Sequence, residues 1–476
     1  MATRDESRID AKPARGLWHQ LPRGNALGRM LLAVTIALVT FGTIFVASAS
    51  EGQSAADGGT AFSIMIHDIA YLCLGIFALY LGTRVRLERL VKSAPLIIGG
   101  GLFLLLAVKA VGVTSNGGKR WLNLRVIDLQ PSELFKLCTV LFIAWLVLHH
   151  HDELNNWKQL LIWTTPVWIG CGFIVLEPDI GTASVVLIIA VAMLAVAGLS
   201  RQLIVGVLVA TGVSIGGYLL FEPYSAKRFF SFLHPNSDLL GNGYQLLQSR
   251  IGLGAGGITG LGLGHSREKW GLLPNPHTDF IFTIVGEELG LVGTLAVIAL
   301  FLAFLMVAVR IAQRCSNQVY RLIAIGITTW IMVEALINIA SVVGWWAVTG
   351  VPLPFFSYGG TALITELAAV GILYNIAHDN TRTGDLTIRE HRVTNFRAAL
   401  ERPRAARARP TRRVEARRPE PRRPEPRRAE PRRADPRRAD PRRVEPRRPD
   451  PRRAEPRRAD PARVDRRGAP RRPREY

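Results

Sequence analysis

Apolar residues fall in long runs that alternate with polar connections over most of the chain. A run of roughly 20 apolar residues is long enough for a helix to cross a membrane, and a helix is expected because hydrocarbon cannot hydrogen-bond to a bare backbone. We therefore predict an all-α polytopic membrane protein with about ten transmembrane helices. The predicted spans are 28–48, 64–83, 94–113, 133–149, 160–177, 181–199, 202–221, 280–309, 321–345 and 360–378.

Cations that flank the spans predict the orientation. Arg15, Arg23 and Arg29 precede the first span, whereas the loop near residues 51–60 has no Lys or Arg. Because cytoplasmic loops are enriched in these residues, we expect a multi-pass protein of the plasma membrane with both termini in the cytoplasm. The longest loop of the body, residues 222–279 between the seventh and eighth helices, then lies on the outer face.

Two predicted outer segments, 114–132 and 222–279, carry cations where the rule expects few. Long loops can cross the membrane regardless of charge, and outer cations can also serve an anionic ligand, so the sequence leaves both interpretations open. The larger segment is rich in glycine but interleaved with Leu and Ile. This composition favours a structured loop over a flexible linker, and such loops often carry chemistry.

The formal net charge of +22 comes mainly from a C-terminal tail in which residues 401–476 hold 30 Arg against 13 acidic residues. Eight consecutive units of Pro-Arg-Arg-x-acid run from Pro421 to Asp460. Proline at every fifth position prevents a stable helix, so we expect disorder. The charge therefore predicts no nucleic-acid-binding domain, and the expected partners of the tail are anionic lipid or an acidic protein. The predicted regions are a cytoplasmic leader (1–27), a membrane domain (28–378) and a cytoplasmic tail (379–476).

The four cysteines do not suggest a framework. Cys73, Cys138, Cys171 and Cys315 lie in or beside apolar runs and form no CxxC pair, so neither a disulfide scaffold nor a zinc site is predicted. The first 20 residues are polar and charged. No cleavable signal peptide is therefore predicted, and the first apolar run is interpreted as a retained helix.

Ionisable side chains in or beside the spans are costly in a membrane and are functional candidates for that reason. Glu133 and Lys136 are three residues apart on one predicted helix and could simply pair with each other. Glu177 and Asp179 flank Pro178 in a tight connection, where Asp179 could cap the next helix. The sequence leaves these structural alternatives open.

Asp279 lies in the stretch HTDFIF, where the predicted outer loop enters a long apolar helix. A carboxylate there is partly desolvated yet reachable from outside, which suits a general base. The alternative is that Thr278 or Asp279 caps the helix. Glu287 and Glu288, two turns deeper, are expected to face the interior of the bundle.

The segment VPLPFFSYGGT, residues 351–361, combines two prolines and two glycines with the hydroxyls of Ser357 and Tyr358. This composition indicates a re-entrant or broken-helix element that lines a cavity. An ordinary outer loop before the last span is the alternative.

Six motifs lie in order and at sensible spacing between Gly28 and Asn375. They are GGKRWLNL (117–124), QPSELFKL (130–137), EPDIGTA (177–183), GNGYQLLQS (241–249), LPNPHTDFIFTIVGEELGLVG (273–293) and TGVPLPFFSYGGT (349–361). Together they resemble the SEDS family, whose members include the division protein FtsW and the elongation protein RodA. The sequences VGEELG and TGVPLPFFSYGG within the last two motifs favour the FtsW-like branch, with a RodA-like protein as the second choice.

The resemblance implies a peptidoglycan glycosyltransferase that polymerises lipid II during cell division, together with a class B penicillin-binding protein transpeptidase. It matches Asp279 to the essential acid of the family. In FLHPNSD, His234 stands where the resemblance expects an acid. The resemblance further implies substrate-facing roles for Lys119, Arg120, Arg228, Gln245, Lys269, His277 and Ser357, with supporting roles for Glu133, Lys136, Glu177, Asp179 and Glu288.

The chemistry of the residues agrees with this function. A polyprenyl pyrophosphate is a good but highly anionic leaving group, which Lys and Arg at the outer surface would hold. The acceptor sugar hydroxyl is a weak nucleophile, and a carboxylate such as Asp279 would take its proton in an inverting transfer. The sequence contains no dedicated metal cage, and a divalent cation at the pyrophosphate is left open.

Two other functions compete with the polymerase. A transporter that flips a lipid-linked precursor would use intramembrane carboxylates, but it would keep its essential residues near the midplane of the membrane. A scaffold for other wall proteins would suit the basic tail but would not need Lys119, Arg228 and Asp279 on the outer side. The expected position of Asp279 at a helix mouth favours the enzyme.

Overall fold

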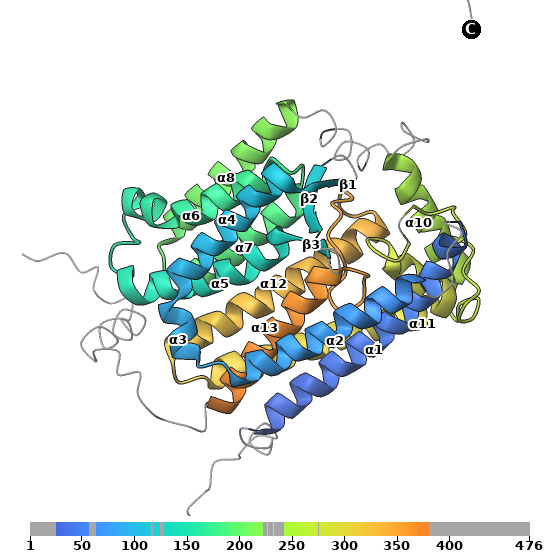
Figure 1. Cartoon of the computed structure of the whole chain (residues 1–476), viewed down its shortest axis with the longest axis horizontal. Coiled ribbons are helices and arrows are strands. Elements are labelled where there is room, and N and C mark those ends of the chain that lie inside the picture. Colours follow the sequence, from blue (N-terminus) through green and yellow to red (C-terminus); the bar gives the residue numbers. More distant parts are fainter. Residues whose placement is uncertain are drawn as a thin grey trace, which may run out of the picture. The chain divides into compact units, whose positions relative to one another are not determined.

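The computed structural model describes residues 25–56, 63–115, 118–123, 128–221, 242–274 and 276–379, together with residues 226 and 232. All of them belong to the first of two compact units, residues 1–393. The predicted leader and nearly all of the predicted tail lie outside the described residues, as do Arg228 and His234. The described part is a helical bundle with a small sheet at one end (Figure 1).

The helices follow the predicted spans closely. Their bounds are α1 (Asn25–Ala56), α2 (Ser63–Arg84), α3 (Leu87–Lys92), α4 (Ala94–Val111), α5 (Pro131–His150), α6 (Trp157–Val175), α7 (Ile180–Val196), α8 (Arg201–Phe221), α10 (Asn242–Gly256), α11 (Ile281–Arg314), α12 (Gln318–Val343) and α13 (Gly360–Asp379). The strands are β1 (Val113–Ser115), β2 (Gly118–Asn123) and β3 (Asp128–Leu129).

Within the described residues, nine helices are long and apolar enough to cross a membrane. The remaining predicted span, 181–199, corresponds to α7, an apolar helix of 17 residues. At 1.5 Å per residue α7 is about 25 Å long, slightly shorter than a typical hydrocarbon core. The prediction of a polytopic helical membrane protein is confirmed.

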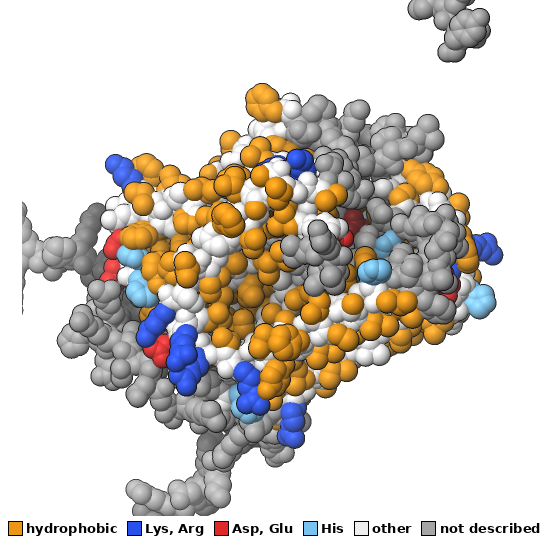
Figure 2. Space-filling model, in the orientation of Figure 1, with side chains coloured by type: hydrophobic (Ala, Val, Ile, Leu, Met, Phe, Trp, Pro, Cys, Tyr) orange, Lys and Arg blue, Asp and Glu red, His pale blue; other side chains and the backbone are white. Residues whose placement is uncertain are grey.

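The exposure of side chains agrees with a lipid-facing surface. Leu96 and Phe103 on α4 are 79% and 69% exposed, although both are large and apolar. Figure 2 shows hydrophobic side chains across most of the visible face of the bundle, with charged side chains mainly near its margins. By contrast, α5 and α13 are largely buried in the middle of the bundle. A water-soluble protein would not leave so much apolar surface exposed.

Close packing of α2 against α13 depends on small residues. An added Cβ at Gly82 would meet the Cα of Gly371 at 3.0 Å, and one at Gly371 would meet the backbone of Leu79. Small residues allow helix backbones to approach each other in membranes, where apolar burial alone gives little driving force.

The three strands form an antiparallel meander in the order β1-β2-β3, with Ser115 opposite Gly118 and Leu122 opposite Leu129. The motif GGKRWLNL therefore lies mainly on a strand, which the hydropathy pattern did not predict. We call the end of the bundle that carries this sheet the loop end. The connection between α6 and α7, the loop before α11 and residues 344–359 also lie there.

Helix α11 is broken at Gly290, where φ is 66° and ψ is −159°. The backbone groups released by the break are hydrogen-bonded to residues 257–262. Leu261 and Gly262 donate their N–H groups to the carbonyls of Glu287 and Glu288, and Leu291 and Val292 donate to Gly257 and Ile258. The predicted span 280–309 is therefore two helical pieces, and the break is satisfied by protein as a membrane requires.

Candidate functional site

Asp279 lies at the loop end, one residue before the N-cap of α11. The N-cap position belongs to Phe280, which makes no side-chain capping bond. The alternative in which Thr278 or Asp279 occupies the N-cap position is therefore not what the structure has. Asp279 is half-buried, so the residue lies partly at the surface of the bundle.

The backbone around Asp279 is held from two sides. Asn338 of α12 donates through Nδ2 to the carbonyl oxygen of Asp279 and to that of Val351, each at 2.9 Å. The N–H of Tyr358 donates to the carbonyl oxygen of His277 at 2.9 Å. These bonds join the HTD stretch to the segment 351–361, although sequence reasoning did not single out Asn338.

The segment 351–361 is irregular and mostly buried until α13 begins at Gly360. The Oε2 atom of Glu366 accepts a bond from the N–H of Phe355 at 2.8 Å. Ser357, a predicted substrate-facing residue, is 7% exposed, and its Oγ accepts a bond from the N–H of Leu353 at 2.8 Å. These contacts indicate that the segment is a rigid support for the HTD stretch.

A second polar group adjoins this support. The ring of Tyr358 lies 6.3 Å from that of Tyr71 and 5.7 Å from that of His277. Burial raises the pKa of Tyr358 to about 12, with further contributions from Tyr71, Asp68 and Asp128. The hydroxyl of Tyr358 therefore keeps its proton near neutral pH and can donate a hydrogen bond. Asp68, a buried carboxylate on α2, was not singled out from the sequence. Its position within an apolar span was the signal that could have identified it, since acids are rare there.

The two predicted cations on β2 have different surroundings. Lys119 is exposed. Arg120 donates to the carbonyl oxygens of Glu177 and Pro178, each at 2.7 Å, and so fastens the sheet to the connection between α6 and α7. Lys119 is thus available at the surface, whereas Arg120 has a structural contact.

The connection between α6 and α7 contains the other two predicted acids. Asp179 caps α7, with Oδ1 accepting from the N–H of Thr182 at 3.1 Å. The carboxylate of Glu177 is buried, and neither oxygen has a hydrogen-bond partner in the described part of the chain. Burial, followed by the charge of Asp179, raises the pKa of Glu177 to about 8, although Lys109 and Arg120 oppose the shift. Glu177 is therefore largely protonated at neutral pH.

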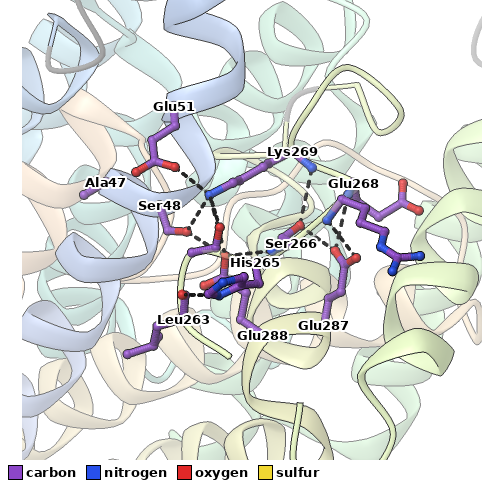
Figure 3. Close-up of polar contacts among 12 residues, drawn as sticks. Ala47, Ser48, Glu51, Leu263, His265, Ser266, Glu268, Lys269, Glu287 and Glu288 are labelled. Carbon is purple, nitrogen blue, oxygen red and sulfur yellow. Dashed lines mark hydrogen bonds and ion pairs between the residues drawn. The ribbon is translucent and has the colours of Figure 1, made fainter. Parts of the chain in front are cut away.

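Lys269 and Glu288 belong to one buried polar network (Figure 3). The Nζ of Lys269 lies 2.6 Å from Oε2 of Glu51 on α1, 2.8 Å from the carbonyl oxygen of Gly264 and 4.0 Å from Oε1 of Glu288. Lys269 is 1% exposed, so in this structure its charge is directed at protein groups.

The paired glutamates of the VGEELG motif hold the loop that precedes the HTD stretch. Glu287 accepts bonds from the hydroxyl of Ser266 at 2.5 Å and from the N–H of Arg267 at 2.9 Å. Glu288 accepts from the hydroxyl of Ser48 at 2.6 Å. Both glutamates face the interior, as the sequence predicted, and they tie residues 263–270 to α11 and α1.

A third buried group lies between α5, α12 and α13. Lys136 pairs with Glu133 at 2.5 Å, as the spacing allowed, and also contacts Glu334 of α12. Glu366 of α13 is close enough to interact electrostatically with Lys136 and Glu133. Through Glu366 the group reaches the segment 351–361. Sequence spacing could not reveal Glu334 and Glu366, which are far from Lys136 in the chain.

The remaining predicted site residues are Gln245 and Arg228. Gln245 is half-buried on α10, and its Oε1 has no hydrogen-bond partner among the residues described. Arg228 is outside the described residues. Across the described ranges, no group of three or more His, Cys, Asp or Glu side chains is arranged to hold a metal ion.

An apolar cavity of about 250 Å³ lies between α6, α7 and α8. Trp168, Cys171 and Leu187 are among its lining residues, and Ser184 and Tyr218 supply a few polar atoms. Its lining residues Val175 and Ile180 flank the connection that contains Glu177.

Residues 28–382 match the sequence profile of FtsW, RodA and SpoVE, a family described as cell cycle protein. The chain belongs to this family. The resemblance to SEDS proteins is thereby confirmed, and with the apolar helices it establishes a multi-pass membrane protein.

Curated members of the FtsW/RodA/SpoVE family are similar over nearly their whole length. A probable peptidoglycan glycosyltransferase FtsW of Coxiella burnetii is 35% identical over 73% of this chain and 95% of its own. Stage V sporulation protein E of Bacillus subtilis is 33% identical over 73% of this chain and 96% of its own.

Solved structures of the family share the fold. One chain, from a structure titled "Structural coordination of polymerization and crosslinking by a peptidoglycan synthase complex", matches with a TM-score of 0.63 at 27% identity, covering 74% of this chain and 98% of its own. The rod shape determining protein RodA of Thermus thermophilus matches with a TM-score of 0.55 at 26% identity, covering 75% of this chain and 97% of its own.

Proposed function

We propose that this protein is a peptidoglycan glycosyltransferase that polymerises lipid II, with Asp279 as the general base. The observation that carries the proposal is the position of Asp279: a half-buried acidic residue at the loop end, on a backbone held by Asn338 and Tyr358. The names of its FtsW relatives support the reaction class.

The proposed step is an inverting transfer. The acceptor sugar hydroxyl attacks the anomeric carbon of the donor sugar, the carboxylate of Asp279 takes the hydroxyl proton, and the polyprenyl pyrophosphate leaves with the electrons of the broken C–O bond. A positioned base contributes roughly 100- to 10,000-fold to such a step. The new bond joins two sugars, so repeated transfer lengthens a glycan strand.

The leaving group needs positive charge near the reaction. We propose that exposed Lys119 on β2 contacts the pyrophosphate, together with Arg228, which is proposed from the sequence. An anionic leaving group is stabilised when cations lie where its charge develops. Tyr358, which keeps its proton, is proposed to donate a hydrogen bond to a sugar oxygen.

The apolar part of the substrate needs a path beside the helices. We propose the cavity between α6, α7 and α8 for a polyprenyl chain, because its lining is mainly apolar and it adjoins the Glu177 connection at the loop end. From the cation pattern of the sequence, we propose that the loop end lies outside and that both termini lie in the cytoplasm.

The proposed cellular role is based on relatives. FtsW-named relatives favour cell division and the septum, and the similar chain from a peptidoglycan synthase complex favours a class B penicillin-binding protein as partner. An elongation role of the RodA type is the second candidate, supported by the Thermus thermophilus structure.

A flippase is the competing function, favoured by the buried charges around Lys136. Purified protein with lipid II as its only substrate distinguishes the two functions. The polymerase forms glycan strands, and Asp279→Ala abolishes them while the protein still inserts into membranes. Asp152→Asn, an exposed acid in the connection between α5 and α6, is the control that retains activity. Glycan formation at the wild-type rate by Asp279→Ala would end the assignment.

A further inference from the structure

A buried amide on α12 contacts the backbone of Asp279. Asn338 is 2% exposed and lies within an apolar span. Its Nδ2 donates to the carbonyl oxygens of Asp279 and Val351, each at 2.9 Å, while its Oδ1 has no hydrogen-bond partner in the described residues. Burying an amide oxygen without a partner is unfavourable, so the placement of Asn338 depends on the two bonds that its NH₂ group donates.

The two carbonyl groups come from different segments. One precedes α11, and the other begins the irregular support 351–361. A single planar NH₂ group that bonds to both fixes the distance between the segments and the direction of each carbonyl. Asn338 therefore sets the register between the HTD stretch and its support.

A second bond restrains the same stretch. The N–H of Tyr358 donates to the carbonyl oxygen of His277, two residues before Asp279. This bond is between backbone groups, so a side-chain substitution does not remove it. The bond from Asn338 comes from a side chain, so a substitution can remove it, and it is made directly to the peptide unit of Asp279.

We infer that Asn338 is a positioning residue that places the carboxylate of Asp279 for proton transfer. The inference rests on the proposed function. An error of about 1 Å in the place of a catalytic group can lower a rate by about 100-fold, even when substrate binding is unchanged. Loss of the two bonds therefore lowers kcat and leaves KM nearly constant.

The chain offers a matched control. Asn375 of α13 makes the same kind of clamp, with Nδ2 donating to the carbonyl oxygens of Gly82 at 3.1 Å and Val85 at 2.7 Å. It joins α13 to the end of α2, on the side of the bundle away from Asp279. Asn375→Asp and Asn375→Leu remove two donated bonds without touching the HTD stretch.

The experiment compares Asn338→Asp and Asn338→Leu with the Asn375 pair in the lipid II assay, after melting temperatures show that each variant is folded. We expect kcat to fall by roughly 10- to 100-fold for the Asn338 variants, with KM within about threefold. The Asn375 variants should keep kcat within about threefold. If Asn338→Asp does not fold, Asn338→Ser, which is smaller and keeps one donor, is judged by the same criterion.

The pH dependence of kcat in Asn338→Asp distinguishes a positioning role from a merely structural one. In Asn338→Asp an ionised carboxylate faces two carbonyl oxygens, whereas a protonated one donates an O–H bond to one of them. The ratio of mutant to wild-type kcat should therefore rise as the pH falls, since dividing by the wild type removes the titration of Asp279 itself. Asn338→Leu cannot recover and should show a flat ratio.

The outcomes separate this inference from the proposed function. If Asp279→Ala is inactive while the Asn338 variants keep wild-type kcat, the positioning role is wrong and the base assignment stands. A flat ratio across pH for Asn338→Asp, with kcat reduced as much as in Asn375→Asp, would also overturn the positioning role. If Asp279→Ala is active, both fail together.

Discussion

Replacing Lys269 by methionine tests the buried network that holds residues 263–270 against α11 and α1. Lys269 has no exposed side-chain surface, whereas its ion-pair partner Glu51 is 46% exposed. The other acid nearby, Glu288, is completely buried 4.0 Å from the ammonium. Lys269→Met therefore leaves one acid that can be hydrated and one that cannot.

The contacts give the expected magnitude. Removing one partner of a buried ion pair costs about 3–5 kcal/mol, because a charge is left without compensation. Glu288 keeps the hydroxyl of Ser48 at 2.6 Å, so we expect a loss near the lower limit, about 3 kcal/mol. Glu51→Gln changes the exposed partner, keeps an amide oxygen that can accept a bond from Lys269, and leaves Glu288 as the counter-charge, so it should cost less than Lys269→Met. The double variant Lys269→Met with Glu288→Gln should recover at least about 1 kcal/mol, since the buried charge is gone.

Thermal unfolding of the four purified proteins, followed by tryptophan fluorescence, measures this order. At roughly 2–4 °C per kcal/mol, Lys269→Met should melt about 6–12 °C below wild type, and Glu51→Gln only a few degrees below. Equal losses for Lys269→Met and Glu51→Gln, or no recovery in the double variant, would refute the buried arrangement.

Three further predictions concern stability and substrate binding. The pKa of Glu177 is raised from its ordinary 4.5 to about 8, so its ionisation opposes folding and stability falls as the pH rises through this window. The melting temperature of Glu177→Gln should therefore rise relative to that of the wild type between pH 5 and pH 8. A pH-independent difference between the two melting temperatures would contradict this. Lys119→Met should raise KM for lipid II without lowering the melting temperature. Arg120→Met loses the bonds to Glu177 and Pro178, so it should lower the melting temperature. The opposite pattern would count against the proposed roles. Gly290→Ala should lower the free energy of unfolding by at least about 2 kcal/mol, because the added Cβ would lie 2.5 Å from the backbone nitrogen of Gly260 and from the carbonyl oxygen of Ile258. The control Gly254→Ala on α10 adds a Cβ that meets nothing within 4 Å, so it should be nearly neutral in the same denaturation assay.

The spans could be predicted because their signal is local. Each helix must cover its own backbone and present apolar side chains to lipid, so length and hydropathy suffice to find it. The break at Gly290 left no such signal, because glycine is tolerated within an apolar run and the groups that satisfy the break, residues 257–262, lie elsewhere in the chain. The strand at residues 118–123 was missed because its partners are two short flanking strands.

The candidate site was predictable only in part, for the same reason. Asp279 could be found because an acid at the mouth of an apolar helix is unusual, and the pairing of Glu133 with Lys136 follows from their spacing. Glu334 and Asn338 act across long separations on another helix, and no periodicity connects them to Lys136 or Asp279. Packing decides such contacts, so they became visible only in the folded protein.

Two groups of buried polar residues lie near the HTD stretch, and their contacts suggest why polar side chains are buried at the loop end. Glu287 and Glu288 hold the loop before the HTD stretch, while Asn338 and Glu366 hold the support behind it. Side chains that position a reacting group gain from being locked by packing and by a second layer of hydrogen bonds. The polar groups are thus concentrated around the backbone that carries Asp279.

Binding and turnover of lipid II by the same sample of Asp279→Asn test the central claim most directly. If Asp279 is the base, the variant binds lipid II with a dissociation constant within about threefold of wild type, and its turnover falls at least about 100-fold. Turnover close to wild type, or a loss explained entirely by weaker binding, would contradict the account.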